Sequence, residues 1–153
     1  MSTDFIHLHV HSEYSLLDGY ATTKAIAERA AELGMDSIAL TDHGVMYGAM
    51  EFYSAAQKAG IKPIIGVEAY IAPGSMRDPI VKGGKNYYHQ LLLAKNETGY
   101  RNLVKLTTRA HLDGMGRGVF ALPRIDRALL EQYHEGIVAT STCIAGEVIQ
   151  HIT

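Results

Sequence analysis

The sequence alternates between short apolar runs and longer segments whose apolar residues recur at helical spacing. Short apolar runs are typical of buried strands, and apolar residues at i, i+3 and i+4 are typical of amphipathic helices. The runs predict strands over residues 5–11, 37–41, 62–72, 87–94 and 136–141. The helical spacing predicts helices over 22–33, over 46–60, through Tyr100, Leu103, Thr107 and Ala110, near 126–132, and from Ala145 onward.

Turn and cap residues separate these segments. Thr22 stands where a helix N-cap is expected, and Gly34 and Gly60 stand where the first two helices should stop. Stretches rich in glycine and proline at 73–86 and 113–118 predict loops. The order is strand, helix, strand, helix, which favours an α/β fold with a parallel sheet, open or closed into a barrel. In such folds the functional site lies at the carboxyl ends of the strands.

Composition narrows the class of protein. With 153 residues and 47% hydrophobic content, the chain is long enough for one domain with a real core. Its net charge of −2 provides no broad basic surface, so any contact with DNA must be local or mediated by metal. The single cysteine, Cys143, the lack of a secretory signal pattern and the lack of an apolar run of about 18 residues predict a cytoplasmic protein.

Residues that can bind metal recur along the predicted strands. They are His9 and His11 at the end of the first, Asp42 and His43 after the second, Glu68 within the third, His89 in the fourth and Cys143 after the fifth. Side-by-side strands would bring them to one pocket. His7, His9 and His11 alternate along an extended segment, so their side chains should share one face.

The residue types suit a transition-metal site. Two histidines two apart on a strand can bind one ion, and imidazole, carboxylate and thiolate together favour zinc, manganese or iron over calcium. The number of candidates suits two or three ions, with Glu68 bridging a pair and Asp42 supporting the ligands through hydrogen bonds. The alternatives are that His89 is a satisfied core histidine, that Cys143 is a small buried apolar residue, and that His7 is structural.

Four segments resemble a known family. They are HLHVHSEYSLLDG (7–19), ALTDHGVMYGAMEFYSAAQKAGIKPIIGVEAY (39–70), LLLAKNETGYRNLVKL (91–106) and STCIAGE (141–147). They are similar to the PHP domain (polymerase and histidinol phosphatase) in the form found at the amino terminus of bacterial DNA polymerase III alpha subunits. The resemblance implies seven metal ligands, which are His9, His11, Asp18, His43, Glu68, His89 and Cys143.

The resemblance also implies a distorted parallel barrel of seven strands with intervening helices, of which five strands can be identified here. The family's late Asp-x-His pair has no counterpart in this sequence. We therefore expect residues 1–153 to be the N-terminal portion of a PHP domain, without its C-terminal part and without the polymerase core. An incomplete barrel leaves unpaired strand edges, which favours self-association.

The implied function is metal-dependent phosphoester hydrolysis by two or three divalent ions, zinc first and manganese or iron as alternatives. In polymerases the resemblance implies 3′-to-5′ proofreading, with the DNA primer end and the rest of the polymerase subunit as partners. One alternative is a non-catalytic docking module that contacts a separate proofreading exonuclease subunit. Another is a small-molecule phosphatase, such as one acting on histidinol phosphate.

Overall fold

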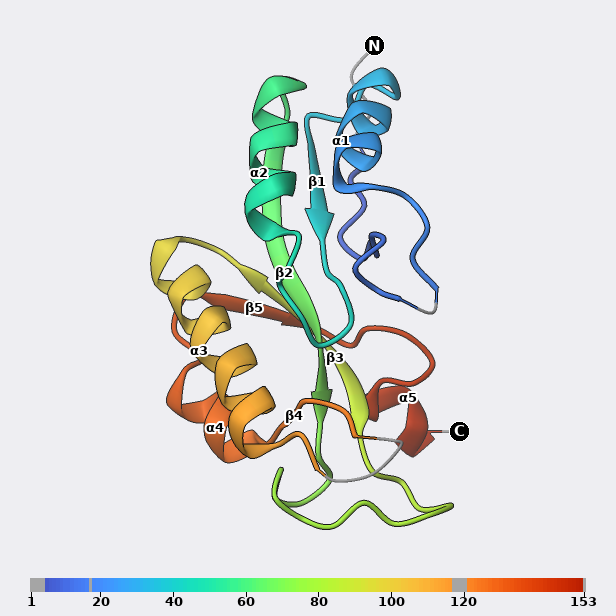
Figure 1. Ribbon diagram of the computed structural model, residues 1–153, viewed down its shortest axis with the longest axis vertical. Coiled ribbons are helices and arrows are strands. Elements are labelled where there is room, and N and C mark those ends of the chain that lie inside the picture. Colours follow the sequence, from blue (N-terminus) through green and yellow to red (C-terminus); the bar gives the residue numbers. More distant parts are fainter. Residues whose placement is uncertain (1–4, 17, 117–120, 153) are drawn as a thin grey trace.

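In a computed structural model, residues 5–16, 18–116 and 121–152 are described. The helices and strands occur in a mixed order along the chain (Figure 1). The elements are α1 (Thr23–Glu32), β1 (Ser37–Leu40), α2 (Ala49–Lys58), β2 (Lys62–Ile71), β3 (Tyr88–Ala94), α3 (Glu97–Asp113), β4 (Arg124–Ile125), α4 (Arg127–Gln132), β5 (Ile137–Thr140) and α5 (Glu147–Ile152). The predicted helices are confirmed, and four of the five predicted strands are present.

Local signals explain where the first helix begins and ends. The Thr22 hydroxyl accepts a hydrogen bond from the Ala25 amide at 3.1 Å, which satisfies one of the free amides at the start of α1. Gly34, with φ of +78°, takes a left-handed conformation that ends the helix. Between these signals, α1 buries Ile26 and Ala30 in the apolar cluster that it shares with β1. The helix is therefore specified by both its caps and its apolar face.

The ten-residue strand β2 is the centre of the sheet. Its first half, Lys62 to Ile65, pairs in parallel with β1, and its second half, Gly66 to Ile71, pairs in antiparallel with β3. Strand β5 pairs in antiparallel with the outer edge of β3, and β4 pairs in parallel with the end of β2. Because β3 occupies one edge of β2, β4 must lie on the opposite edge, which is the edge that β1 occupies along the first half of β2.

The prediction of a wholly parallel sheet is therefore wrong for two of the four pairings. A parallel neighbour needs a crossover that carries the chain back to its starting end, usually by a helix. Between β2 and β3 the chain has only the predicted loop, residues 73–86, which contains no helix or strand, so the chain simply reverses direction. In the described residues the sheet stays open, and no closed seven-stranded barrel is formed.

Two further differences from the sequence prediction concern short segments. Residues 5–11 are extended beside β1, where the carbonyls of His7 and Val10 accept hydrogen bonds from Ala39 and Thr41, but they do not form a regular strand. The ladder is interrupted because the Val10 amide bonds the Thr41 hydroxyl at 2.9 Å instead of a carbonyl. Strand β4 was not predicted, because two residues provide no readable period. Of the predicted loop 113–118, residues 117 and 118 lie outside the described part.

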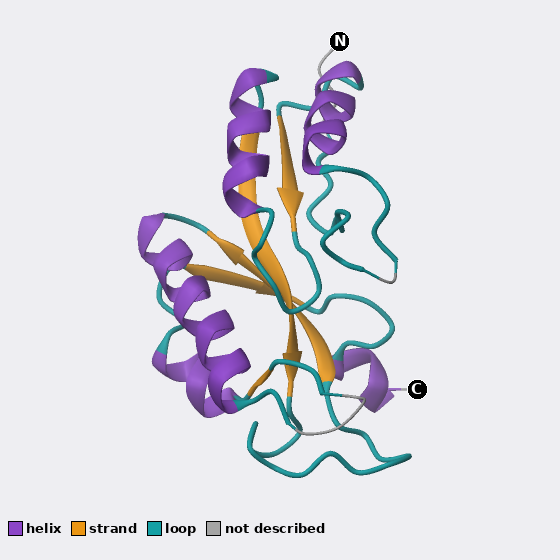
Figure 2. Cartoon of the chain, in the orientation of Figure 1, coloured by secondary structure: helices purple, strands orange, loops and turns teal. Residues whose placement is uncertain are grey.

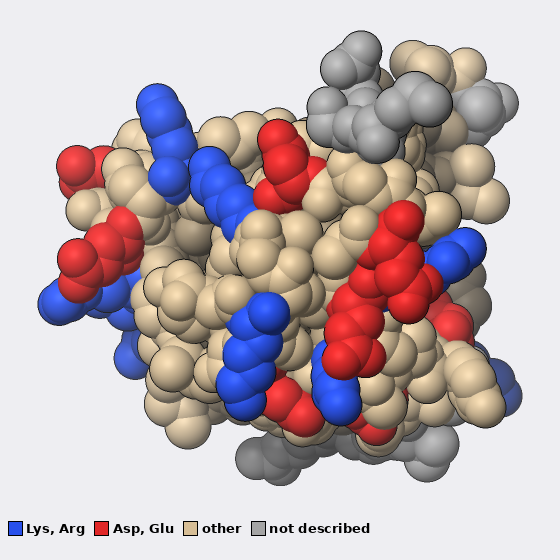
Figure 3. Space-filling model, turned by 90° about the horizontal axis from the view of Figure 1, so that it is seen from above, with Lys and Arg blue, Asp and Glu red and all other residues tan. Residues whose placement is uncertain are grey.

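Helices lie beside both halves of the sheet (Figure 2), and the buried apolar residues form a separate cluster in each half. Helices α1 and α2 pack beside β1, with Phe52 fully buried between them. Helix α3 packs against β2 and β3 around Leu92, Leu103 and Leu106, and Leu129 of α4 belongs to the same cluster. On the face seen in Figure 3, acidic and basic side chains are interspersed, in keeping with the small net charge. The polar cluster described next lies where the two halves of the sheet meet.

Candidate metal centre

A cluster of imidazoles surrounds the carboxylate of Glu68. Glu68 lies in β2 just after the point where that strand changes partners from β1 to β3. Its side chain is only 1% exposed, and both oxygens face histidine nitrogens. Oε1 is 2.9 Å from His89 Nδ1 and 3.3 Å from His9 Nε2. Oε2 is 2.6 Å from His43 Nδ1 and 3.5 Å from His11 Nε2.

The extended segment before α1 brings His9 and His11 to this carboxylate. Their Nε2 atoms lie 2.9 Å apart, so both rings point to the same place, as alternation along an extended chain predicts. His7 does not join them: its exposed ring packs edge-to-face on Phe5 at 4.8 Å. The prediction that all three histidines share a face is therefore wrong for His7, because the segment departs from regular strand geometry.

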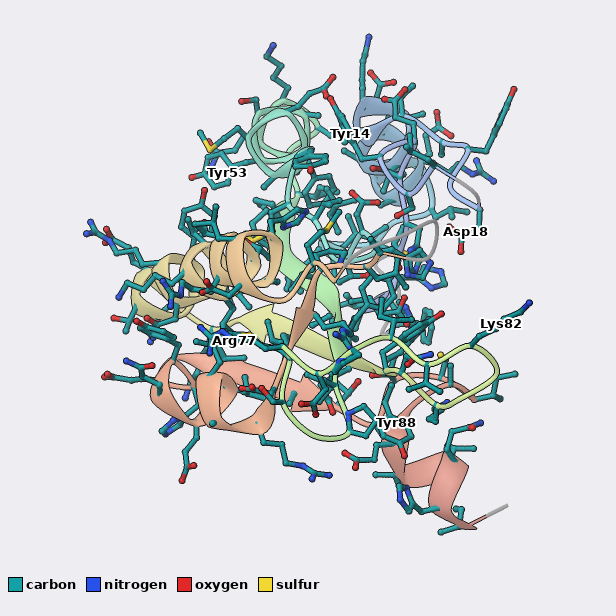
Figure 4. The ribbon with its side chains drawn as sticks, turned by 60° about the horizontal axis from the view of Figure 1, so that its bottom comes forward. Tyr14, Asp18, Tyr53, Arg77, Lys82 and Tyr88 are labelled. Atoms are coloured by element: carbon teal, nitrogen blue, oxygen red, sulfur yellow. The ribbon has the colours of Figure 1, made fainter. Side chains whose placement is uncertain are left out.

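His43 connects Glu68 to the amino-terminal loop. It follows β1 and forms an isolated parallel bridge with Glu68, so backbone pairing places the two side chains next to each other. Its other ring nitrogen, Nε2, is 2.8 Å from Asp18 Oδ2. Asp18 is more exposed than the rest of the cluster, with 56% of its side chain accessible, and it marks the solvent side of the site (Figure 4).

Strand β3 and the segment after β5 supply the remaining candidates. Tyr70 pairs with His89 across β2 and β3, and antiparallel partners project their side chains from the same face, which is also the face of Glu68. The Cys143 sulfur lies 3.7 Å from both Glu68 Oε1 and His89 Nδ1. Thr142, immediately before it, has a φ of +68°, a strained conformation for a β-branched residue.

Asp42 faces away from the cluster into a separate network of hydrogen bonds. Its carboxylate accepts bonds from the Ser12 amide at 2.7 Å and the Ser12 hydroxyl at 2.8 Å. It also accepts a bond from the Ser15 hydroxyl at 2.7 Å, and Ser15 Oγ lies 3.2 Å from His11 Nδ1. The His43 amide donates to the same Ser15 oxygen at 3.2 Å. Asp42 is thus connected through one serine to two candidate ligands.

Burial and close contacts shift the ionisation of the central groups in opposite directions. Burial on its own raises the pKa of Glu68, but contacts with the surrounding imidazoles, His43 first, hold that pKa far below its usual range. Burial lowers the pKa of His43, but contacts with Glu68 and Asp18 outweigh it and raise the value to about 8. Burial is also the main reason that the pKa of His11 lies below its usual value. The site therefore holds an ionised carboxylate among imidazoles of unequal basicity.

These residues fit a metal-binding site on two observations. Among the described residues, His43 Nδ1 and Glu68 Oε2 are buried and make no hydrogen bond of normal geometry, although they are 2.6 Å apart. Two nitrogens bound to one ion at about 2.0–2.1 Å must lie within about 4.2 Å of each other, and the His9 and His11 nitrogens, 2.9 Å apart, satisfy this. A cation shared by such atoms removes the cost of burying them unpaired.

Within the described part of the chain, three groups of donor atoms could each hold an ion, their atoms lying within 4.8 Å of one another. They are His9, His11 and Glu68; His11, Asp18 and His43; and His43, Glu68 and His89. All seven residues that the family resemblance implied lie in or beside these groups. The sequence reasoning did not identify Ser12 and Ser15, because isolated serines in a loop provide no pattern that distinguishes them from ordinary turn residues.

The sequence pattern of the PHP domain family matches residues 7–153. The chain therefore belongs to the PHP domain family.

Two relatives are DNA polymerase III alpha subunits. The subunit from Borreliella burgdorferi is 53% identical over 146 residues, which cover 93% of this chain and 12% of that protein. The subunit from Treponema pallidum is 48% identical and covers 94% of this chain and 12% of that protein. The chain thus spans about an eighth of the length of these relatives.

Among solved structures, a protein from Bifidobacterium adolescentis described as a candidate metal-dependent phosphoesterase shares 21% identity, with a TM-score of 0.46. That similarity covers 69% of this chain and 34% of the other. No helix in the described part of the chain has both the length and the apolar character that a bilayer crossing needs.

Proposed function

We propose that this chain is the N-terminal portion of a PHP domain in a longer DNA polymerase III alpha subunit, and that the domain hydrolyses phosphodiester bonds. The proposed substrate is the 3′ end of a DNA primer, with proofreading as its role. The observation that carries the proposal is the Glu68 carboxylate, 1% exposed, with four imidazole nitrogens at 2.6–3.5 Å. Coverage of about an eighth of the relatives' length supports the view that the chain is part of a longer subunit.

The proposed cofactors are two or three divalent transition-metal ions, zinc first and manganese or iron as alternatives. The residues that would hold them are His9, His11, Asp18, His43, Glu68, His89 and Cys143. When bound, such ions supply Lewis acidity and neutralise negative charge on phosphate oxygens. The mixture of imidazole, carboxylate and thiolate matches transition metals better than calcium or magnesium.

The chain's own residues prepare the site for this chemistry. Glu68 stays ionised at neutral pH and directs one oxygen toward His9 and the other toward His43, an arrangement suited to a bridging ligand. Asp42 holds Ser15, which contacts the His11 imidazole and accepts a hydrogen bond from the backbone amide of His43, so that little rearrangement is needed when ligand binds. The Asp18 side chain is exposed, so a phosphate could reach the centre from solvent on that side.

The proposal is tested by replacing Glu68 with Gln in the natural gene product. Hydrolysis of a mismatched primer end should fall at least about 100-fold, because bound ions provide several kcal/mol of transition-state stabilisation. Glutamine has nearly the same volume, so packing should change little, whereas loss of the charge that faces the imidazoles should lower the chemical denaturation midpoint. Glu97→Gln, on the exposed start of α3, is the matched control and should leave both quantities unchanged.

The outcomes separate the proposal from its alternative. Unchanged primer hydrolysis in the Glu68→Gln protein would refute the catalytic proposal. If the metal-loaded wild-type protein leaves primer ends intact and Glu68→Gln loses much of its stability, the result would instead favour a docking module in which metal serves the fold.

A further inference from the structure

A cavity lies beside the candidate metal centre, on the side of the loop that joins β2 to β3. It has a volume of about 580 Å³, within the range of about 300–1,000 Å³ typical of small-ligand sites. Tyr70 and Tyr87 form part of its wall, and Ile80, Val81, Ala121 and Leu122 add apolar surface. This cavity contains none of the candidate metal ligands, so it is a separate feature of the same face.

Aromatic contacts connect this cavity directly to the metal centre. The Tyr70 ring stacks on His43, with centroids 6.1 Å apart and an angle of 10° between planes. The Tyr87 ring stacks on His89, at 5.8 Å and 14°. The two tyrosines meet edge to face, with centroids 5.0 Å apart and 76° between planes, and form a corner in which Tyr70 is only 8% exposed and Tyr87 is the more accessible ring. Anything bound in this corner lies one ring away from two candidate metal ligands.

A buried arginine holds the loop that forms the rest of the cavity. Arg124 is 2% exposed, and its Nη2 donates to the carbonyls of Met76 at 3.0 Å and Asp78 at 2.6 Å. Its Nη1 donates to the carbonyl of Asn86 at 3.4 Å. The guanidinium therefore fastens the loop near both of its ends, so the cavity wall is prearranged before ligand binds.

The chemistry of the lining favours a ligand that stacks on aromatic rings over one that is recognised by hydrogen bonds. The Asn86 amide donates to the carbonyls of Val81 and Gly84, and its oxygen accepts from the Val81 amide at 2.7 Å. Asn86 thus uses its polar atoms inside the loop. Lys82, on the same lining, extends outward from the loop and brings positive charge to the rim, as Figure 4 shows. A flat aromatic group joined to a phosphate matches this combination.

We propose that this cavity is a subsite for the terminal nucleobase of the substrate, which stacks on Tyr87 in the corner that this ring makes with Tyr70, while its phosphate lies at the metal centre. Because stacking does not depend on base identity, the subsite accepts all four bases. The assignment of the phosphate rests on the proposed function, whereas the assignment of the base rests on the cavity itself.

The hydrolysis test uses the zinc-loaded natural gene product and two single-stranded DNA oligonucleotides, one with a normal 3′-terminal nucleotide and one with an abasic 3′ end. Wild type should prefer the normal end by about 5- to 140-fold in kcat/KM, the range expected from stacking of one base. Tyr87→Ala should abolish the preference, and Tyr87→Phe should keep it. Tyr88→Ala is the matched control, because the neighbouring Tyr88 ring packs toward α5 at 5.6 Å from His151.

A binding measurement separates failure of the subsite from failure of the proposed function. By calorimetry, 2′-deoxyadenosine 5′-monophosphate should bind zinc-loaded wild type at least about fivefold more tightly than 2-deoxyribose 5-phosphate, with the difference lost in Tyr87→Ala. If this difference in binding is found but primer ends are not hydrolysed, the proposed function is refuted and the subsite is supported. Equal binding of the two ligands by wild type overturns the subsite, whether or not primer ends are cleaved. Zinc content per chain is measured in each variant to show that the metal centre is intact.

Discussion

Gly19→Ala should damage the proposed metal centre by moving Asp18. Gly19 lies directly after Asp18, and its amide donates to the Ser15 carbonyl at 2.8 Å in a compact loop. A Cβ added at Gly19 would lie 1.8 Å from the Ser12 carbonyl oxygen. This neighbour is backbone, and it is fastened by the Ser12 amide's bond to Asp42, so it cannot rotate away.

The size of the effect follows from these distances. The distance between the new Cβ and the Ser12 oxygen must grow from 1.8 Å to at least 3.0 Å, which requires a shift of about 1.2 Å. Metal ligands tolerate deviations of only about 0.2 Å, so a shift of this size removes Asp18 from any ion that it shares with His43. We expect one ion fewer per chain, or a loss of at least about tenfold in the affinity of one site. Overpacking should also lower stability by about 1–3 kcal/mol.

The assay is elemental analysis of purified protein together with zinc titration of the metal-free form, in the natural gene product. Gly99→Ala is the matched control, because its added Cβ would lie 1.9 Å from the Gly136 carbonyl oxygen, at the start of α3 and away from the cluster. It should show a similar loss of stability with the wild-type number of ions. The reasoning fails if Gly19→Ala keeps the full complement of ions at wild-type affinity, or if Gly99→Ala loses ions to the same extent.

Three further predictions concern stability. Phe52→Ala should lower the free energy of unfolding by about 3–5 kcal/mol in urea denaturation, because the ring is fully buried in the core between α1 and α2; a change below about 1 kcal/mol would contradict this packing. Thr22→Ala should lower the free energy of unfolding by about 1 kcal/mol through loss of the α1 cap, whereas Thr22→Ser should keep the wild-type value; equal stability of the two variants would argue against the cap. The pKa of His43, raised to about 8 in the metal-free protein, stabilises the fold fully below pH 6.5, and this contribution is lost as pH rises through 8. Chemical denaturation in the presence of chelator should show that decline, and Asp18→Asn, which removes one of the charges that raise this pKa, should reduce it.

The structure of the helices was predictable because their signals are local. Thr22 and Gly34 act through bonds and backbone angles within a few residues, and the apolar spacing of α1 and α3 needs no knowledge of their partners. Strand existence was also predictable from apolar runs, apart from β4, which has only two residues, and residues 5–11, whose regular pairing is interrupted by a hydroxyl from Thr41.

Strand direction was not predictable, because it depends on how the chain returns between strands. The helical segments between β3 and β5 favour a parallel connection in the sequence, yet β3 and β5 pair in antiparallel, as do β2 and β3, whose connecting loop contains no helix. The candidate ligands do lie together, as expected, but antiparallel pairing brings some of them together instead of the shared end of parallel strands. His89 meets Glu68 because the start of β3 lies beside the end of β2.

The amino-acid sequence by itself determined the family, the helices and the identity of the residues able to bind metal, because motifs, caps and residue chemistry are properties of short segments. Only the tertiary structure decided that His7 stays outside the cluster, that Asp42 forms hydrogen bonds with Ser12 and Ser15, and that two tyrosines form a corner beside it. These features depend on side-chain directions and on contacts between segments far apart in the chain, which are set only when the sheet is assembled.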